Sequence, residues 1–274
     1  MLRSLYSGVS GMKGFQTKLD VIGNNIANVN TTGFKSSRVM FKDMLSQTSA
    51  GASAPTDEGT GGINPKQVGL GVQVSSIDTL HLPGSAQTTN NPTDLRINGD
   101  GFFLIKMTTE QDQPYLTRAG DFHIDANRNL VTSDGMYVCD DGGGAPITLG
   151  DTTVAFSISQ DGSIVETLDD GTIETNARIG VATVPNTEGL EKIGGSLYRL
   201  TVNAIEGGVI EDYYGGNDAE GGTGAIISGQ LEMSNVELTN EFTEMIVAQR
   251  GFQANSRIIT TGDSILEEVV NLKR

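Results

Sequence analysis

The sequence predicts a discontinuous α+β fold, with one long helix at each end of the chain and a mostly antiparallel β-rich region between them. Near both termini, apolar residues recur at alternating spacings of three and four, which is the periodicity of an amphipathic helix. Between these segments, short β-prone runs alternate with Asp-Gly and Asn-Gly turns. Glycine accounts for 36 of the 274 residues, about twice its usual share. Abundant glycine suits many short strands joined by tight turns.

The N-terminal helix is predicted over the first thirty residues, and Gly33 supplies its stop. Its apolar stripe is interrupted by Gln16 and Gly23 and is widened by Phe15 and Ile22. The other members of the stripe are Leu2, Leu5, Val9, Met12, Leu19 and Ile26. Such a stripe is typical of a helix that packs against other helices along its length.

The C-terminal helix is predicted to begin near Asn235, because Ser234 and Glu237 have the spacing of a capping box. Its apolar stripe has gaps at three polar positions, namely Gln249, Ser256 and Asp263. The stripe itself consists of Leu238, Phe242, Met245, Phe252, Ile259, Leu266 and Val270.

The two stripes form the predicted self-assembly seam, but the pattern leaves the partner of the seam open. A pair of helices inside one globular domain shows this periodicity, and so do helices that pack against other copies of the chain. The predicted seam residues are Leu5, Val9, Met12, Leu19, Ile22, Ile26, Leu238, Phe242, Met245, Phe252, Ile259 and Leu266.

The predicted domain organisation has three parts. Residues 1–33 and 235–274 form a terminal helical domain, residues 34–71 form a linker or extended arm, and residues 72–234 form a β-rich body. Most of the arm is rich in Gly, Ser and Thr with almost no apolar content.

Turn signals organise the predicted β-rich body. Residues 95–105 place Asn-Gly-Asp-Gly between two apolar runs, which predicts a hairpin. Further Asp-Gly turns occur at 134–135, 161–162 and 170–171. The spacing of the strands suits an antiparallel sandwich or barrel.

Charge and hydropathy exclude two kinds of partner. The net charge is −16, and residues 46–233 hold 26 acidic against eight basic side chains, so we expect no nucleic-acid binding. No stretch approaches the roughly 18 uninterrupted apolar residues of a membrane span, so we expect no membrane insertion. The N-terminus also lacks the apolar core of a secretory signal peptide.

No catalytic, cofactor-binding or metal-binding constellation is found, so we expect a protein that is not an enzyme. Phosphate-loop patterns are absent, and His81 and His123 occur in separate stretches without a nucleophile motif. Cys139 is the sole cysteine and belongs to no CxxC pattern. The segment from Asp125 begins like a calcium loop but lacks the required Gly and Glu. An acidic secreted hydrolase stays a remote alternative, because two of the many carboxylates could face each other.

The terminal blocks carry a resemblance to a known family. Residues 5–45 (LYSGVSGMKGFQTKLDVIGNNIANVNTTGFKSSRVMFKDML) resemble the N-terminal signature of the bacterial flagellar rod and hook family. Residues 228–274 (SGQLEMSNVELTNEFTEMIVAQRGFQANSRIITTGDSILEEVVNLKR) are similar to its C-terminal signature. INGDGFFLI at 97–105 and YLTRAGDFHIDANRNLVTSDGMYV at 115–138 also resemble family segments.

The resemblance implies a structural subunit of a tube. The two terminal helices would form a coiled-coil-like inner layer around a channel, and the β body would form the next layer. Implied partners are other copies of the chain, the distal rod, the hook cap, the hook-filament junction proteins and the flagellar export apparatus. The implied location is the flagellar hook or basal body, extracellular, reached by type III export without a cleaved signal peptide. A turn role at the end of the first helix is implied for Asn24, Asn25, Asn28, Gly33 and Phe34.

Within this family the motifs favour the hook. MIVAQR at 245–250, FKDML at 41–45 and the closing NLKR resemble the hook subunit more than the distal rod subunit. The length points the other way, because many hook subunits carry an added outer domain. We therefore favour a compact hook subunit, a flexible joint that transmits motor torque to the filament, with the distal rod subunit as the alternative.

Overall fold

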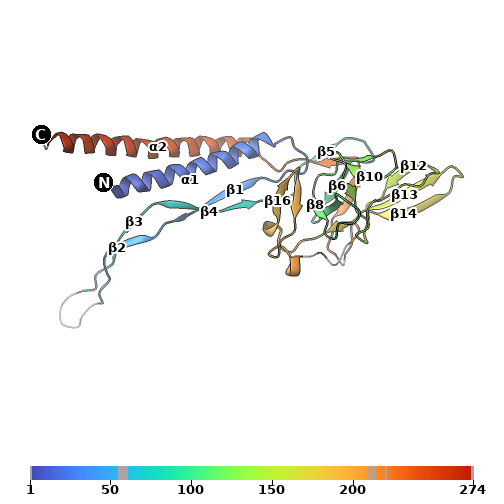
Figure 1. Ribbon diagram of the computed structural model, residues 1–274, viewed down its shortest axis with the longest axis horizontal. Helices are drawn as coiled ribbons and strands as arrows, with labels where there is room; N and C mark the ends of the chain where they lie inside the picture. Colours follow the sequence, from blue (N-terminus) through green and yellow to red (C-terminus); the bar gives the residue numbers. More distant parts are fainter. Residues whose placement is uncertain (1, 55–60, 209, 211–213, 220, 273–274) are drawn as a thin grey trace. The chain divides into compact units, whose positions relative to one another are not determined.

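The computed structural model describes residues 2–54, 61–208, 210, 214–219 and 221–272 of the chain. Contacts divide the chain into two units (Figure 1). The helical unit comprises Met1–Ala27, Ser37–Thr79 and Glu237–Arg274, and the β body comprises Asn28–Ser36 and Leu80–Val236. The predicted α+β class, with terminal helices and an antiparallel β-rich middle, is confirmed.

The helical unit pairs the two ends of the chain. Helix α1 (Leu2–Ala27) lies beside helix α2 (Leu238–Asn271) in antiparallel orientation (Figure 1). Strands β1 (Ser37–Asp43) and β4 (Val72–Thr79) form an antiparallel ribbon that contacts α1.

Residues 34–71, predicted as a linker or extended arm, contain three strands that pair with neighbours. Besides β1, strand β2 (Ser46–Ala50) pairs antiparallel with β3 (Lys66–Gly69). Both β2 and β3 are exposed along their whole length. The polar composition of the arm thus gives a solvated two-stranded ribbon, because pairing satisfies the backbone even without a core.

The predicted capping box at the start of the second helix is wrong. Helix α2 begins at Leu238, and its N-cap Glu237 makes no side-chain capping hydrogen bond. The Ser234 hydroxyl instead accepts from the Val236 amide at 3.3 Å. The Asn235 side chain accepts from the Ser36 amide at 2.8 Å and donates to the Leu80 carbonyl at 2.8 Å. Both side chains are thus engaged outside the helix, which begins at Leu238, three residues after the predicted start.

The strand pairs of the β body are antiparallel. The largest sheet has eight strands in the order β16-β17-β8-β7-β11-β10-β9, with β15 also paired to β7; the order β12-β13-β14 makes a second sheet, and β18-β6 and β19-β5 are two-stranded. The elements are β5 (Ala86–Thr88), β6 (Leu95–Asn98), β7 (Phe102–Lys106), β8 (Tyr115–Thr117), β9 (Phe122–Ile124), β10 (Leu130–Thr132), β11 (Tyr137–Val138), β12 (Thr153–Ile158), β13 (Ser163–Leu168), β14 (Ile173–Arg178), β15 (Val181–Ala182), η1 (Thr187–Gly189), β16 (Glu191–Gly194), β17 (Leu197–Arg199), η2 (Glu206–Gly208), β18 (Ala225–Ser228) and β19 (Gln230–Glu232).

Strand β7 is the centre of the core, because all five of its residues are buried. Successive side chains of a strand point to opposite faces, so β7 serves two apolar clusters. Phe103 and Ile105 join the larger cluster, and Phe102 and Leu104 join the smaller one.

The Asp-Gly turns were predicted correctly, but the hairpin at residues 95–105 is wrong. Gly135, Gly162 and Gly171 adopt φ of 79°, 81° and 74° in turns between paired strands. Strand β6, by contrast, pairs with β18, while β7 pairs with β8, β11 and β15. Strands β6 and β7 therefore belong to different sheets. Strand β6 is in the two-stranded sheet with β18, and β7 is in the eight-stranded sheet.

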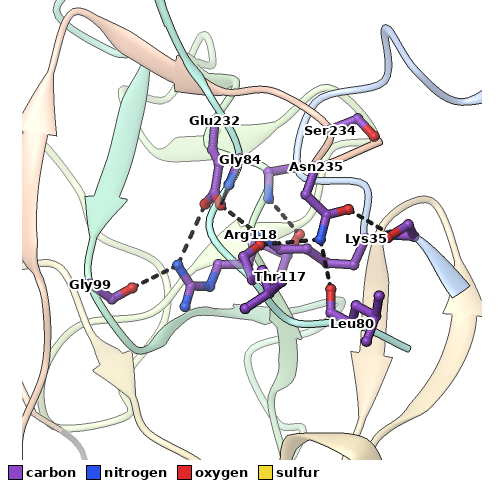
Figure 2. Close-up of polar contacts among 12 residues, drawn as sticks. Lys35, Leu80, Gly84, Gly99, Thr117, Arg118, Glu232, Ser234 and Asn235 are labelled. Carbon is purple, nitrogen blue, oxygen red and sulfur yellow. Dashed lines mark hydrogen bonds and ion pairs between the residues drawn. The ribbon is translucent and has the colours of Figure 1, made fainter. Parts of the chain in front are cut away.

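A buried ion cluster ties together the two segments through which the chain enters and leaves the β body. Glu232 accepts from Lys35 Nζ at 2.6 Å and from the Gly84 amide at 3.0 Å, and lies 3.5 Å from Arg118 Nη1. Arg118 Nη1 also donates to the Gly99 carbonyl at 3.0 Å (Figure 2). The side chains of Lys35, Glu232 and Arg118 are 0%, 1% and 5% exposed. We call these three residues the charged core.

A substitution at Gly33 tests how tightly the entering segment is held. Gly33 has φ of 65°, and an added Cβ would lie 2.5 Å from the Ala119 amide nitrogen. Gly171 has a similar φ of 74° but no atom within 4 Å of that position. We expect Gly171→Ala to cost about 1–2 kcal/mol from backbone strain alone, and Gly33→Ala to cost clearly more. Urea denaturation measures both, and equal losses would contradict close packing around Gly33.

Candidate self-assembly surface

Glycines let α1 and α2 approach each other closely. An added Cβ would lie 2.6 Å from the Phe15 ring at Gly251, 2.9 Å from the Leu5 side chain at Gly262, and 2.6 Å from the Asn255 amide at Gly11. Close backbone approach of this kind requires small residues at the contact. The helices of this unit therefore pack through small positions as well as through apolar ones.

The residues of α2 that contact α1 lie one position before the polar gaps in the apolar stripe of this helix. Ala248 is fully buried, and Asn255 and Gly262 contact α1 one and two heptads further on. Their neighbours Gln249, Ser256 and Asp263 occupy the gaps of the apolar stripe. The signal that sequence reasoning missed is the presence of small residues such as Ala248 and Gly262 along this line, which an apolar pattern does not count.

The predicted seam residues differ in how far they are covered within the helical unit. Ile22 is buried. Seven are half-buried, namely Leu5, Met12, Leu19, Ile26, Met245, Ile259 and Leu266. Four are exposed, namely Val9, Leu238, Phe242 and Phe252. The contact between α1 and α2 therefore covers only part of the seam.

Exposed apolar side chains flank the α1 contact on both sides of α2. At about 100° per residue, the contact residues share one face of the helix, and two apolar rows lie beside it. The first row consists of Leu238, Phe242, Ile246, Phe252 and Val270, and the second of Val247, Ile258, Ile265 and Val269. Phe242 and Ile246 are 50% and 59% exposed. We call these nine residues the flanking rows.

Flanking rows of this kind are typical of an interaction surface. Contiguous exposed apolar surface on a protein usually marks an interaction site. A helix with a single apolar stripe can bury that stripe against one neighbouring helix. Helix α2 has further apolar side chains on both sides of its contact with α1.

Asn25 fixes the β1–β4 ribbon and the start of α2 to the end of α1. This buried side chain donates from Nδ2 to the Ser37 carbonyl at 2.8 Å and to Glu241 Oε1 at 3.1 Å. Its Oδ1 accepts from the Ser37 amide at 3.0 Å. One amide side chain thus satisfies both backbone groups of Ser37 and joins three elements, which is more than the turn role implied by the resemblance.

Glu241 is expected to make the stability of the helical unit depend on pH. Burial raises the pKa of its carboxyl, Glu244 raises it further, and Asn25 and Lys18 oppose the shift. A carboxyl whose pKa is higher in the folded than in the unfolded state favours folding only while it is protonated. This contribution is fully present below the unfolded pKa and is lost as the pH rises through the higher folded pKa.

The variant Glu241→Gln keeps an acceptor for Asn25 but cannot ionise. We expect its melting temperature to exceed that of the wild type at about pH 7 and to approach it at about pH 3.5, below the ordinary pKa of a Glu carboxyl. Glu267→Gln, at an exposed position of α2, is the matched control and should shift the melting temperature equally at both pH values. A lower melting temperature for Glu241→Gln at neutral pH would contradict the role given to this carboxyl.

The described part of the chain offers little for catalysis. Within it, no group of three or more His, Cys, Asp or Glu side chains is placed to hold a metal ion. Burial raises the pKa of the Cys139 thiol to about 12, so the thiol stays protonated at neutral pH. Among the helices described, none has the length and apolar character needed to cross a membrane.

Comparison with known families identifies three matching segments. Residues 5–35 match the family described as flagella basal body rod protein. Residues 96–166 match the D1 domain of flagellar hook protein FlgE/F/G, and residues 227–272 match the C-terminal region of flagellar basal body rod FlgEFG protein.

Individual relatives bear rod and hook names. The chain is 53% identical to the flagellar basal-body rod protein FlgG of Bacillus subtilis over 100% of both chains. It is 37% identical to FlgG of Borreliella burgdorferi, again over 100% of both chains. The flagellar hook protein FlgE of the latter organism is 55% identical, but over 50% of this chain and 30% of its own length. The crystal structure of Helicobacter pylori flagellar hook protein FlgE2 shows 16% identity and a TM-score of 0.24 over 62% of this chain and 47% of that one, too low a score for the folds to be compared.

Proposed function

Because the chain belongs to the flagellar rod and hook family, we propose that it is a subunit of the basal-body rod that polymerises with copies of itself through its terminal helices. Membership of this family confirms the resemblance drawn from the terminal motifs. It also establishes the chain as a structural protein of the flagellum and not an enzyme.

The assignment to the rod is supported by the extent of the matches. The two rod relatives align with this chain from end to end, with no part of either chain left over. The hook relative from Borreliella burgdorferi aligns with half of this chain and leaves 70% of its own length unmatched. A length shared with the rod proteins favours a shared place in the flagellum.

The hook stays the second candidate, because a specific observation favours it. Where the hook relatives align, they reach 55% and 53% identity, as high as the value for the rod protein of Bacillus subtilis. The motifs at residues 41–45 and 245–250 favoured the hook on the sequence alone, and that preference stays a prediction. A hook subunit would form a curved, flexible tube, whereas a rod subunit would form a straight shaft.

Polymerisation through the terminal helices is supported by the flanking rows. Nine large apolar side chains of α2 are exposed beside its contact with α1. In a tube, other copies of the helical unit would cover them. For the second candidate, a hook subunit, the proposed partners by family resemblance are the distal rod, the hook cap, the hook-filament junction proteins and the export apparatus.

Electron microscopy of basal bodies from a deletion strain separates the two candidates. If this chain builds the rod, the strain should make truncated rods, and the gene on a plasmid should restore them. Complete rods that end without a hook would overturn the rod assignment in favour of the hook.

A further inference from the structure

A groove lies in the helical unit where α1 meets α2. It has a volume of about 370 Å³ and is lined by Ser4 of α1 and by Arg257, Ile258, Thr261, Gly262 and Ile265 of α2. Gly262 has no side chain and Ser4 has a short one, so neither fills the space between the helices. The groove is an apolar hollow beside the contact between the helices, with one charged residue, Arg257, in its lining.

Helix α1 exposes an aromatic side chain on the side away from this groove. Tyr6 is 72% exposed, and Val9, about one turn further on, is also exposed. At about 100° per residue, Tyr6 lies about 200° around the helix from Ser4, which lines the groove. Tyr6 therefore cannot enter the groove of its own chain.

A groove and an exposed ring on opposite sides of one unit suit a contact that repeats from copy to copy. A contact between two different surfaces does not close into a twofold dimer and instead propagates into a ring or an open filament. Copies in a tube follow one another in the same direction. Helix α1 of one copy would thus lie antiparallel to α2 of the next, as the two helices do within one chain.

We propose that the groove receives Tyr6 from the α1 helix of a neighbouring copy. This inference rests on the proposed polymerisation and names one of its contacts. Ile258 and Ile265 cover the ring, and the guanidinium of Arg257 lies over its face. The same arrangement brings Lys13 of the neighbour towards Arg257, but both are exposed, so salt screens their repulsion.

Charges beside the ring and beside the groove favour the same arrangement. Arg3 precedes Tyr6 by three residues and Glu268 follows Ile265 by three, so each charge lies on the same side of its helix as that apolar neighbour. Antiparallel helices bring Arg3 of one copy to Glu268 of the next. Both are exposed, and among the described residues neither has an ion-pair partner. Each also has the unfavourable sign for its own helix end, so the contact compensates both charges.

Tyr6→Ala tests the occupant of the groove, with Tyr6→Phe as the matched control. Alanine favours a helix, so the first variant keeps α1 folded, but loss of the covered ring should raise the critical concentration for polymerisation at least about tenfold. Tyr6→Phe keeps the ring and should polymerise at nearly the wild-type concentration, as measured by sedimentation. Equal critical concentrations for Tyr6→Ala and the wild type would overturn the inference and leave the proposed function standing. A wild-type chain that never polymerises would overturn both.

A mixture of charge-reversed variants tests whether the contact joins different copies. Arg3→Glu and Glu268→Arg each place two like charges at the contact, and each alone should raise the critical concentration about fivefold. In an equimolar mixture, the carboxylate introduced in one variant faces the guanidinium introduced in the other, and the unchanged residues pair in the alternate contacts. We therefore expect the mixture to polymerise at nearly the wild-type concentration. A mixture that polymerises no better than either variant alone would overturn the contact between copies.

Discussion

Replacing Glu232 by alanine is expected to destabilise the β body by about 3–5 kcal/mol, a large fraction of the total stability of a typical domain. The side chains of Lys35 and Arg118 are 0% and 5% exposed, and this one carboxylate serves both. Its removal leaves two buried cations without an anion. Burial already lowers the pKa of Lys35, and Glu232 is the main group that opposes this shift.

An exposed ion pair with the same N–O distance supplies the control for Glu232→Ala. Glu191 and Arg199 lie 2.6 Å apart, the same distance as Lys35 and Glu232, but both are largely exposed. Glu191→Ala should leave the urea denaturation midpoint, followed by circular dichroism, nearly unchanged. Similar midpoints for the two variants would show that the charged core does not hold the entering and leaving segments together.

Replacing Phe252 by aspartate is expected to abolish polymerisation while leaving the monomer folded. Phe252 is 37% exposed in the helical unit and belongs to the flanking rows. Covering an unpaired carboxylate in an apolar contact costs several kcal/mol, which corresponds to a rise of at least about a hundredfold in the critical concentration. Sedimentation at increasing concentration measures this rise, and circular dichroism reports the fold of the monomer.

Thr243→Asp is the matched control for Phe252→Asp. Thr243 is exposed on α2, and at about 100° per residue it lies on the side of the helix that faces away from the α1 contact. We expect this variant to polymerise much as the wild type does. Polymers of Phe252→Asp at normal concentration would refute the assignment of the flanking rows to assembly.

The helices could be predicted from the sequence because their signal is local and periodic. The three-four spacing identified α1 and α2, although α2 begins at Leu238 and not near Asn235. The contact line between them could not be predicted from apolarity. It passes through Gly251, Gly262 and Ala248, which matter for their small size.

In the β body, turns could be predicted from the local sequence, but pairing between distant strands could not. Asp-Gly turns such as the one at Gly171 were predicted correctly, because an isolated turn fixes its own hairpin. The partner of β6 is β18, some 130 residues away in the chain, and no local pattern selects it. Lys35 and Glu232 read as ordinary charged residues in the sequence, yet the fold buries them together.

The sequence motifs do not separate a rod subunit from a hook subunit. The motifs around residues 41–45 and 245–250 lie in or beside the helical unit, and the hook relatives match this chain over half its length. Packing of the helices constrains those motifs, and the same packing would serve a rod or a hook. The distinction therefore depends on the extent of the whole chain more than on any single motif.

Hydrogen exchange of α2, compared between the dilute monomer and the concentrated polymer, tests most directly whether copies of the chain cover the flanking rows. We predict rapid amide exchange along Leu238–Asn271 in the monomer and strong protection of the same amides after assembly, while the buried strand β7 is protected in both states. Equal and strong protection of α2 in both states would mean that the helix is already complete in the single chain, and would contradict the account.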